Sequence, residues 1–461
     1  MFERLVRGPA GCRRWTFAVL CSVIFGCAGQ QGERYDRMAA ALRKTPATPR
    51  SGAERDGPPF ERAAALERRA FVREVLRRNP NIEAARQAWR AALAEYPQRT
   101  ALDDPMLEYS FAPLSIGSND VRFGQVIAVS QRFPWPGKLE LQGEVALAEA
   151  EAARENFEAA RRGLAAVAAS LFDEYYASER ALEINRAHRA LVAEIKSAAE
   201  AQYAAGRASQ QEPLQAEIEL AHVEHDRVVL ESCRSVIAAR MNGLLRRRPD
   251  LPLPPPPRRA EPSLSTVGES GPLRAEALSN RPELRAAKQR IRGRQSAVEL
   301  ADRRYYPDFG VSASYNSMWD MPEHQWMVGL SVNIPIQTGT RGSAVEQAEA
   351  TRAQTEALLL GESDDVGVEV ERARHGVIQA QHVVRVYRER LLPAARAQIE
   401  VARIGYSTGR NSFQALIDAE RSVRNLELSY EEALAGLGRA WAELDRAVGR
   451  IAGMPETGES P

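Results

Sequence analysis

The chain has 461 residues, and its 62 lysines and arginines are nearly balanced by 61 aspartates and glutamates. This balance excludes a large basic surface and argues against nucleic acid as a partner. Three of the four cysteines lie within the first 27 residues, so a disulfide framework is excluded as well.

The start of the chain has the pattern of an export signal. Four arginines among the first 14 residues precede the apolar run "WTFAVLCSVIF" (15–25). Eleven residues are too few to span a bilayer, so the run predicts a signal peptide. The following "IFGC" resembles a bacterial lipobox, which implies cleavage after Gly26 and a lipid on Cys27. Ala28 in the next position implies sorting to the outer membrane. The alternative is an ordinary cleavage site with an incidental cysteine.

Short segments of the chain alternate between apolar and polar residues. The second half contains "DFGVSASYN" (308–316) and "WMVGLSVNI" (326–334), which alternate cleanly. In the first half Leu107, Tyr109 and Phe111 face away from their polar neighbours. Such runs are typical of membrane β-barrel strands, but a half-buried soluble sheet shows the same alternation.

Very long helices follow the strands. Residues 139–205 contain no proline and are rich in alanine, glutamate, arginine and leucine. About 65 residues at 1.5 Å each give roughly 100 Å, which predicts a coiled-coil hairpin or the wall of a helical tube. Residues 212–245 return along this helix. In the second half, residues 342–409 bend at Pro393 and residues 411–447 return.

The chain repeats its own order of motifs. "NPNIEAARQAW" from Asn79 is similar to "RPELRAAKQRI" from Arg281, and "YAAGRAS" from Tyr203 is similar to "YSTGRNS" from Tyr406. The prolines between the copies exclude helix and predict an extended linker. We therefore expect a signal peptide (1–26), an N-terminal extension after the lipidated cysteine (27–60), a first repeat (61–245), a Pro-rich linker (246–272), a second repeat (273–450) and a flexible tail (451–461).

Four strands cannot close a barrel, since closed membrane barrels need about eight, and an open sheet edge is not tolerated in lipid. If these strands lie in a membrane, several chains must pool them. Three chains would supply twelve strands.

These segments resemble the TolC family of outer-membrane efflux proteins. The resemblance rests on "SQRFPWPGK" (130–138), the "NP-x-(I/L)-x-AA" openings and the two "Y-x-x-G-R-x-S" turns, and it covers roughly residues 65–450. "FPWPGK" is most similar to the heavy-metal (CzcC- and CusC-like) branch. The resemblance implies a mainly α homotrimer in which long helical hairpins form a trimeric α-barrel across the periplasm. The pooled strands would form a 12-stranded transmembrane β-barrel in the outer membrane of a Gram-negative bacterium.

The resemblance also implies roles for particular residues. Around the "PWPG" stretch, Pro134 and Pro136 would stop strand pairing and Gly137 would let the chain turn into the helix. In the second copy Pro335 and Gly339 would do the same. These five residues would form the joint between barrel and tunnel.

The two turns between long helices are the strongest candidates for a functional site. Glycine there permits a positive φ where a helix reverses, so a purely structural turn is the alternative. The resemblance implies that the tips dock a periplasmic adaptor (membrane fusion protein), itself joined to an inner-membrane RND-type pump. The tip residues are Tyr203, Gly206, Arg207 and Ser209, and Tyr406, Gly409, Arg410 and Ser412. Asp418 and Glu420 would form an acidic ring that favours cations, with helix capping or salt bridges as the alternative.

Other polar clusters give weaker signals. His222 and His225 stand three apart on a helix and could hold a metal, but this spacing more often marks a solvated helix face. Asp173 and Glu174 are likewise expected on a solvated face. No catalytic or phosphate-binding motif occurs, so we expect neither an enzyme nor a cofactor.

The sequence therefore predicts the outer-membrane exit duct of a tripartite efflux system, with metal cations as one substrate class. One alternative is the outer-membrane channel of a type I protein secretion system. Another is a periplasmic coiled-coil adaptor, although adaptors lack paired strands and usually have one hairpin.

Replacing Cys27 by serine should abolish lipidation. The wild-type protein should incorporate labelled palmitate and show globomycin-sensitive processing, because the apolar run ends in "IFGC". An unlabelled wild-type protein would contradict the lipobox interpretation.

Overall fold

The computed structural model describes residues 28–47, 60, 64–117, 123–258 and 264–452. The signal peptide, Cys27 and residues 453–461 of the tail lie outside the described residues. The chain forms two compact units. The sheet unit comprises Met1–Thr45, Arg86–Asn156 and Arg285–Gly361, and the hairpin unit comprises Pro46–Ala85, Phe157–Leu284 and Glu362–Pro461. Two long helices, α5 (Lys138–Ala204) and α10 (Thr338–Val386), contribute residues to both.

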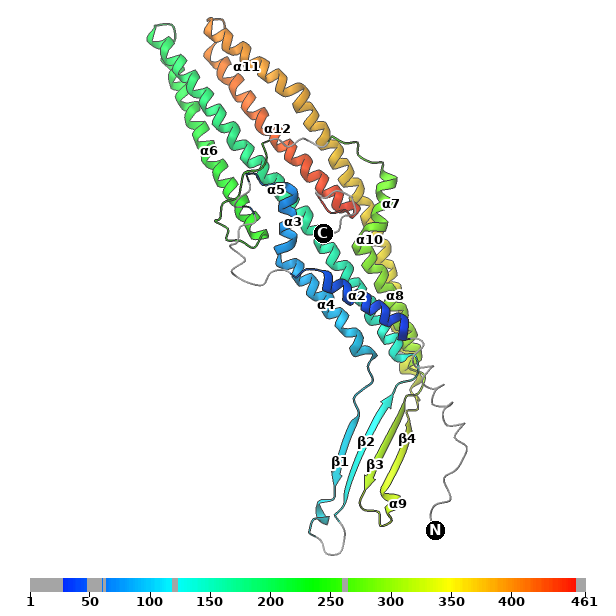
Figure 1. Cartoon of the computed structure of the whole chain (residues 1–461). Coiled ribbons are helices and arrows are strands. Elements are labelled where there is room, and N and C mark those ends of the chain that lie inside the picture. Colours follow the sequence, from blue (N-terminus) through cyan, green and yellow to red (C-terminus); the bar gives the residue numbers. More distant parts are fainter. Residues whose placement is uncertain (1–27, 48–59, 61–63, 118–122, 259–263, 453–461) are drawn as a thin grey trace. The chain divides into compact units, whose positions relative to one another are not determined.

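The sheet unit contains four antiparallel strands in the order β1-β2-β3-β4 (Figure 1). Their bounds are Met106–Phe111, Gln125–Phe133, Phe309–Asn316 and Trp326–Val332. The short helices η1 (Pro113–Ser115) and α9 (Pro322–Gln325) lie in the two hairpin connections. The central pair, β2 with β3, joins the first half of the chain to the second.

The register gives the sheet one apolar face and one face of small and polar residues. Across the apolar face, Tyr109 pairs with Ile127, Ile127 with Tyr315, and Tyr315 with Trp326. On the other face Ser130 pairs with Ser312, among similar small residues. The alternation predicted for these segments is confirmed. All six residues of β1 are exposed, and Val328 of β4 is 84% exposed.

Three helices pack against the start of α5 (Lys138–Ala204), namely α2 (Ala28–Lys44), α4 (Pro80–Thr100) and α8 (Pro282–Arg303). The start of α10 (Thr338–Val386) also belongs to the sheet unit. Within the expected N-terminal extension, α2 is a packed helix: Tyr35 stacks on Tyr96 at 5.0 Å, and Arg34 pairs with Glu144 at 2.7 Å.

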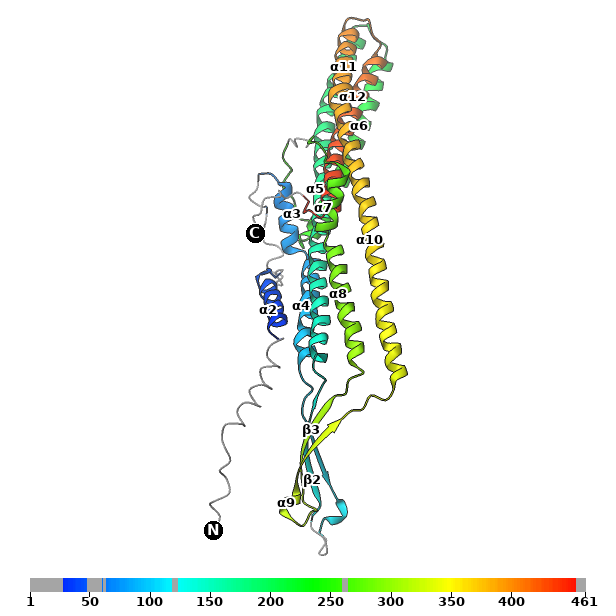
Figure 2. The same ribbon diagram turned by 90° about the vertical axis from the view of Figure 1, so that its right-hand side faces the viewer.

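The hairpin unit consists of two pairs of antiparallel helices with shorter helices at their base (Figure 2). The later part of α5 pairs with α6 (Gln211–Leu244), and α11 (Leu392–Ser407) pairs with α12 (Phe413–Val448). The shorter helices are α3 (Arg68–Arg78) and α7 (Ser270–Asn280). A core that includes Phe71, Phe172 and Met241 joins α3, α5 and α6.

The described residues of the proline-rich linker contact other parts of the hairpin unit. The Leu66 N–H donates to the Pro255 carbonyl at 2.8 Å, and the Asn242 amide donates to the Leu251 carbonyl at 2.7 Å. Helix α7 begins at Ser270, so the last three residues of the expected linker are helical. Pro272 is tolerated there because it lies in the first turn of α7, where its missing N–H would have no partner within the helix.

Pro393 bends its helix without ending it, as expected. A π-helical turn, η2 (Tyr387–Leu391), separates α10 from α11, and the Leu392 N–H donates to the Tyr387 carbonyl five residues back. Proline has no N–H and clashes with the carbonyl four residues before it, so the wider turn accommodates the ring.

The expectation that Asp173 lies on a solvated face is wrong. Asp173 is 8% exposed and accepts two hydrogen bonds from Arg68, at 3.0 Å from Nε and 2.8 Å from Nη2. Arg68 also donates to the Gly438 carbonyl at 3.2 Å. A Cβ on Gly438 would stand 2.5 Å from Asp173 Oδ2, so the absence of a side chain there makes room for the ion pair.

Replacing Gly438 by alanine should lower the stability of the hairpin unit. The new methyl group displaces a buried carboxylate from its arginine, and we expect a loss of about 2 kcal/mol. Thermal unfolding followed by circular dichroism measures the change. Gly436→Ala is the matched control, because a Cβ there meets only the Arg439 guanidinium at 3.9 Å. Equal melting temperatures for the two variants would contradict this role of Gly438.

Candidate functional site

The two helix-reversing turns of the hairpin unit have the same hydrogen-bond pattern. Gly206 and Gly409 adopt φ values of 68° and 71°, the left-handed conformation expected for both. The Arg207 N–H donates to the Gln202 carbonyl at 2.9 Å, and the Arg410 N–H donates to the Gly405 carbonyl at 2.7 Å. Each helix therefore ends in a Schellman motif, which only glycine closes without strain.

Serines begin the returning helices, and a tyrosine joins the two turns. The Ser412 hydroxyl caps α12 by accepting from the Ala415 N–H at 3.2 Å, and Ser209 accepts from the Gln211 N–H at 3.2 Å. The Tyr406 hydroxyl donates to Glu212 on α6 at 2.7 Å. Burial and this carboxylate raise the pKa of Tyr406, which keeps the hydroxyl protonated as the donor. Arg207, Arg410 and Tyr203 are exposed.

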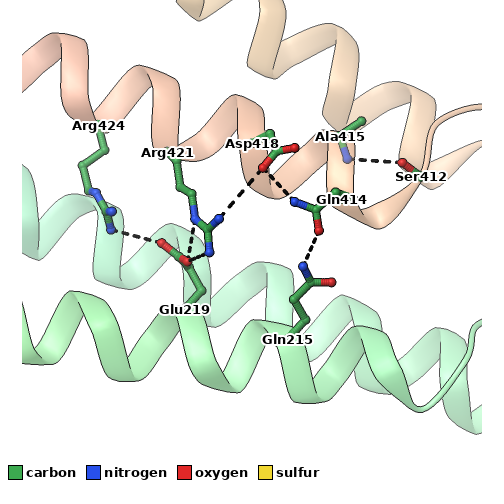
Figure 3. A network of polar contacts seen from close by, with 8 residues as sticks. All are labelled: Gln215, Glu219, Ser412, Gln414, Ala415, Asp418, Arg421 and Arg424. Carbon is green, nitrogen blue, oxygen red and sulfur yellow. Dashed lines mark hydrogen bonds and ion pairs between the residues drawn. The ribbon is translucent and has the colours of Figure 1, made fainter.

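A polar network joins α6 to α12 as well (Figure 3). Glu219 is 1% exposed, and its two oxygens accept from Arg421 Nε at 2.8 Å and from Arg424 Nη1 at 3.3 Å. Gln215 donates to Gln414, which in turn donates to Asp418 at 2.8 Å. A buried carboxylate is costly unless it is paired, so these contacts fix the two helix pairs against each other.

The two acidic residues proposed for the entrance lie in different environments. Asp418 has a side chain that is 57% exposed, whereas Glu420 is completely buried. Glu420 accepts a hydrogen bond from His188 on α5 at 2.8 Å. A carboxylate enclosed by its own chain cannot line an entrance, so the expectation for Glu420 is wrong, and only Asp418 remains a candidate.

His188 is held between two carboxylates. Its Nδ1 contacts Glu420 and its Nε2 contacts Glu427 Oε2 at 3.1 Å, while Arg396 pairs with the other oxygen of Glu427 at 2.8 Å. Burial lowers the pKa of His188, but the hydrogen bonds to the two glutamates outweigh burial and raise the pKa to about 9. The imidazolium therefore ties α5 to α12 at neutral pH.

A shallow groove of about 420 Å³ lies between α11 and α12 near their turn. Small residues line it, among them Ala394, Ala397 and Ala415, and Val401 at its edge is 66% exposed. Sequence reasoning did not find this groove, because its residues are separated by a turn.

The joint expected around Pro134, Pro136 and Gly137 is a second cluster, within the sheet unit. Gly137 has a φ of 88°, as a turn glycine requires. Lys138 is buried, and its Nζ donates to Asp308 at 2.7 Å and to the Tyr306 carbonyl at 2.9 Å. Asp308 also accepts from the Trp135 N–H at 3.0 Å.

The second joint is built differently. Gly339 is the second residue of α10 and does not adopt a positive φ, so the expectation that it repeats the role of Gly137 is wrong. The chain after Pro335 turns through two tight contacts, from the Ile336 N–H to the Ile334 carbonyl and from the Thr338 N–H to the Ile336 carbonyl, both 3.0 Å.

The histidine pair lies on α6. His222 and His225 are both exposed. Among the described residues, no three His, Cys, Asp or Glu side chains gather where they could hold a metal ion. No helix in the described part of the chain is both long and apolar enough to cross a membrane.

Known proteins are similar to this chain in sequence and in fold. Residues 273–450 match the family described as "Outer membrane efflux protein". The cobalt-zinc-cadmium resistance protein CzcC of Cupriavidus metallidurans (strain ATCC 43123 / DSM 2839 / NBRC 102507 / CH34) is 25% identical over 181 residues. This match covers 39% of the chain and 42% of the relative, so it spans less than half of that protein.

Solved structures match over most of the chain. The outer-membrane channel OprN superposes with a TM-score of 0.70 at 19% identity and covers 88% of this chain and 97% of its own. CusC superposes with a TM-score of 0.71 at 17% identity, covering 84% and 92%. At these identities the likeness establishes the fold.

The stability contributed by His188 should disappear at high pH. The folded-state pKa of about 9 exceeds the ordinary value of 6.5, so the contribution is complete below pH 6.5 and is lost as the pH rises through 9. The stability lost over this pH range amounts to about 3 kcal/mol. Thermal unfolding between pH 6 and 10 should show a decline that His188→Gln lacks. His375→Gln, which removes an exposed histidine, serves as the control. Parallel pH profiles for the wild type and His188→Gln would contradict this role of His188.

Proposed function

We propose that this chain, which belongs to the outer membrane efflux protein family, is the exit duct of a tripartite efflux system in a Gram-negative outer membrane. One observation carries the proposal. The same chain combines a four-stranded sheet, apolar on one face, with two pairs of long helices that reverse in matched glycine turns. A sheet suited to lipid and a helical conduit suited to the periplasm are the two parts that such a duct needs.

The proposed assembly is a homotrimer. The antiparallel order β1 to β4 makes the two edge strands run in opposite directions, so β4 of one copy and β1 of the next would pair antiparallel. Three copies then close a 12-stranded barrel with the apolar face toward lipid. The two repeats, 61–245 and 273–450, would each contribute two strands and one helix pair.

The proposed docking surface for the adaptor is the pair of helix tips. Arg207, Arg410 and Tyr203 are exposed there, and the alanine-lined groove between α11 and α12 offers an adjacent surface for a helical partner. An RND-type pump in the inner membrane would supply the driving force. Asp418, exposed near the second tip, is the proposed acidic residue of the entrance.

Metal cations are the proposed substrate class. This rests on the similarity to CzcC, whose name refers to cobalt, zinc and cadmium resistance. Transport through the duct would be passive, so the chain needs neither catalytic residues nor a cofactor. Attachment of the N-terminus to the outer membrane through a lipid on Cys27 remains part of the proposal. No observation favours type I secretion over efflux.

Bulky residues at the two tips should uncouple the duct from its partner. In Gly206→Val with Gly409→Val, both positive φ values become strained at a cost of about 1 kcal/mol or more each. A Cβ at either position meets nothing within 4 Å, so the damage comes from the backbone of the turn. Outer-membrane protein levels should remain normal, whereas efflux and cross-linking to the adaptor should be lost.

The matched control is Gly163→Val with Gly376→Val. These glycines lie inside α5 and α10, adopt no positive φ and also have open space around them. Wild-type efflux in the tip variant, or equal loss of efflux in the control variant, would refute docking at the tips.

A further inference from the structure

A stack of side chains leads from a guanidinium to the apolar face of the sheet, at the end where β2 ends and β3 begins (Figure 1). The Cζ atom of Arg303 lies 5.9 Å from the centroid of the Tyr306 ring. The Tyr306 ring stacks on Trp135 with centroids 5.1 Å apart, and Trp135 stacks on Phe309 at 5.7 Å. Phe309 pairs with Phe133 at the end of the apolar face. The stack therefore passes from a charge, through two amphipathic rings, to an apolar surface.

Two adjacent tyrosines are exposed at this stack. Tyr305 and Tyr306 are 39% and 47% exposed. The Tyr305 hydroxyl donates to the Thr338 carbonyl at the start of α10, 3.4 Å away. Tyrosine and tryptophan are enriched where a bilayer meets water, because their rings are apolar and carry one polar group. Exposed tyrosines at the end of an apolar face therefore fit the headgroup level of a bilayer.

Three arginines accompany these rings. Arg303 Nη1 donates to the Pro136 carbonyl at 3.3 Å. Arg341 on α10 donates from Nε to the Arg304 carbonyl at 2.8 Å and from Nη1 to the Gln337 carbonyl at 2.9 Å. Within the described part of the chain, none of the three arginines forms an ion pair with a carboxylate. A guanidinium has five N–H donors, so these contacts leave donors and the whole positive charge for an anion.

The acidic residues nearby do not cancel this charge. Asp308 is buried and pairs with Lys138 at 2.7 Å and with Arg132 at 2.6 Å. Asp302 is exposed at the end of α8, directly before Arg303. One aspartate thus accompanies three arginines, and the excess of positive charge favours an anionic ligand.

The combination of groups selects an anionic phospholipid. An inorganic anion or an acidic protein segment would use the guanidiniums but would leave the tyrosines and the apolar face unused. A phospholipid uses all of them, because its phosphate pairs with arginine, its glycerol region packs on the rings and its acyl chains cover the apolar face. A planar guanidinium can also donate two parallel hydrogen bonds to one phosphate.

We propose that the segment Arg303–Tyr306, together with Trp135 and Arg341, binds anionic phospholipid at the headgroup level of the membrane. The proposal rests on the proposed function in one respect, which is that the sheet lies in a membrane. It adds the class of lipid and the residues that select it. The segment would also fix the depth of the sheet, because moving the stack into hydrocarbon would bury the charge of Arg303.

The test measures the binding of fluorescent phosphatidylglycerol to the purified full chain in a neutral detergent. Unlabelled phosphatidylglycerol, phosphatidylcholine and inorganic phosphate are the competitors. We expect phosphatidylglycerol to compete about tenfold better than the zwitterionic phosphatidylcholine, and inorganic phosphate not to compete at the same concentrations. The double variant Arg303→Gln with Arg341→Gln should bind the labelled lipid about tenfold more weakly.

Two further proteins make the result specific. Arg292→Gln with Arg294→Gln is the matched control, because it removes the same charge from exposed positions of α8, roughly 15 Å before Arg303 along the helix. It should bind normally. Arg303→Lys with Arg341→Lys keeps both charges and should bind within about threefold of the wild type. This variant separates the loss of charge from a defect in folding.

Four results would overturn the proposal. They are unchanged binding in the glutamine variant, equal loss in the α8 control, equal loss in the lysine variant, and displacement by phosphatidylcholine or inorganic phosphate as effective as by phosphatidylglycerol. Because binding is measured without transport, failure here leaves the proposed duct untouched. Conversely, selective lipid binding in a protein that does not support efflux would count against the duct alone.

Discussion

The outer edges of β1 and β4 are the constraint on which the proposed assembly depends. Within the described part of the chain, each edge strand pairs with one neighbour, which leaves its other row of backbone N–H and C=O groups without strand partners there. Such edges are aggregation hazards in water and are not tolerated in lipid. The apolar face also needs a non-aqueous environment, because Trp326 and Leu330 on it are 71% and 74% exposed. A second copy that continues the sheet would pair these edge groups, which removes the problem in water and in lipid alike.

The hairpin unit solves a different problem, which is to hold long helices in register. Its helices meet through apolar cores and through buried ion pairs. Three such pairs are Asp173 with Arg68, His188 with Glu420, and Glu219 with Arg424. In each pair the buried group meets an opposite charge. Removing one partner would leave a buried charge unpaired, so these pairs specify the helix arrangement more than they add net stability.

The strands, the long helices and the turn glycines Gly137, Gly206 and Gly409 were predictable from the sequence, because each depends on local chemistry. Period-two alternation identifies β3 and β4, the absence of proline identifies α5, and the "GR" turns identify Gly206 and Gly409. Whether the two halves are true repeats and whether the chains form trimers remain interpretations of the same patterns.

The partners of buried polar residues were not predictable, because they depend on which helices meet. Nothing around Glu420 in the sequence indicates His188, which lies 232 residues away and completes its burial. Asp173 was misplaced for the same reason, since its partner Arg68 comes from α3. Gly339 shows the converse limit. Its position in an aligned motif suggested a turn, but α10 begins at Thr338, four residues before the expected start at residue 342. The helix α2 was also missed, as its packing depends on contacts such as that of Tyr35 with Tyr96.

Disulfide cross-linking of the sheet edges is the most direct measurement. Glu108→Cys on β1 would be combined in turn with Met327→Cys, Gly329→Cys or Ser331→Cys on β4, all on the same face, in a Cys233→Ser background. Edges that pair between copies bring two of these cysteines within about 7 Å, close enough to bond. We predict covalent dimers and trimers on a non-reducing gel for at least one pair, and none for Glu108→Cys alone. Monomers from all three pairs, in protein recovered from the outer membrane, would contradict closure of the sheet by neighbouring copies.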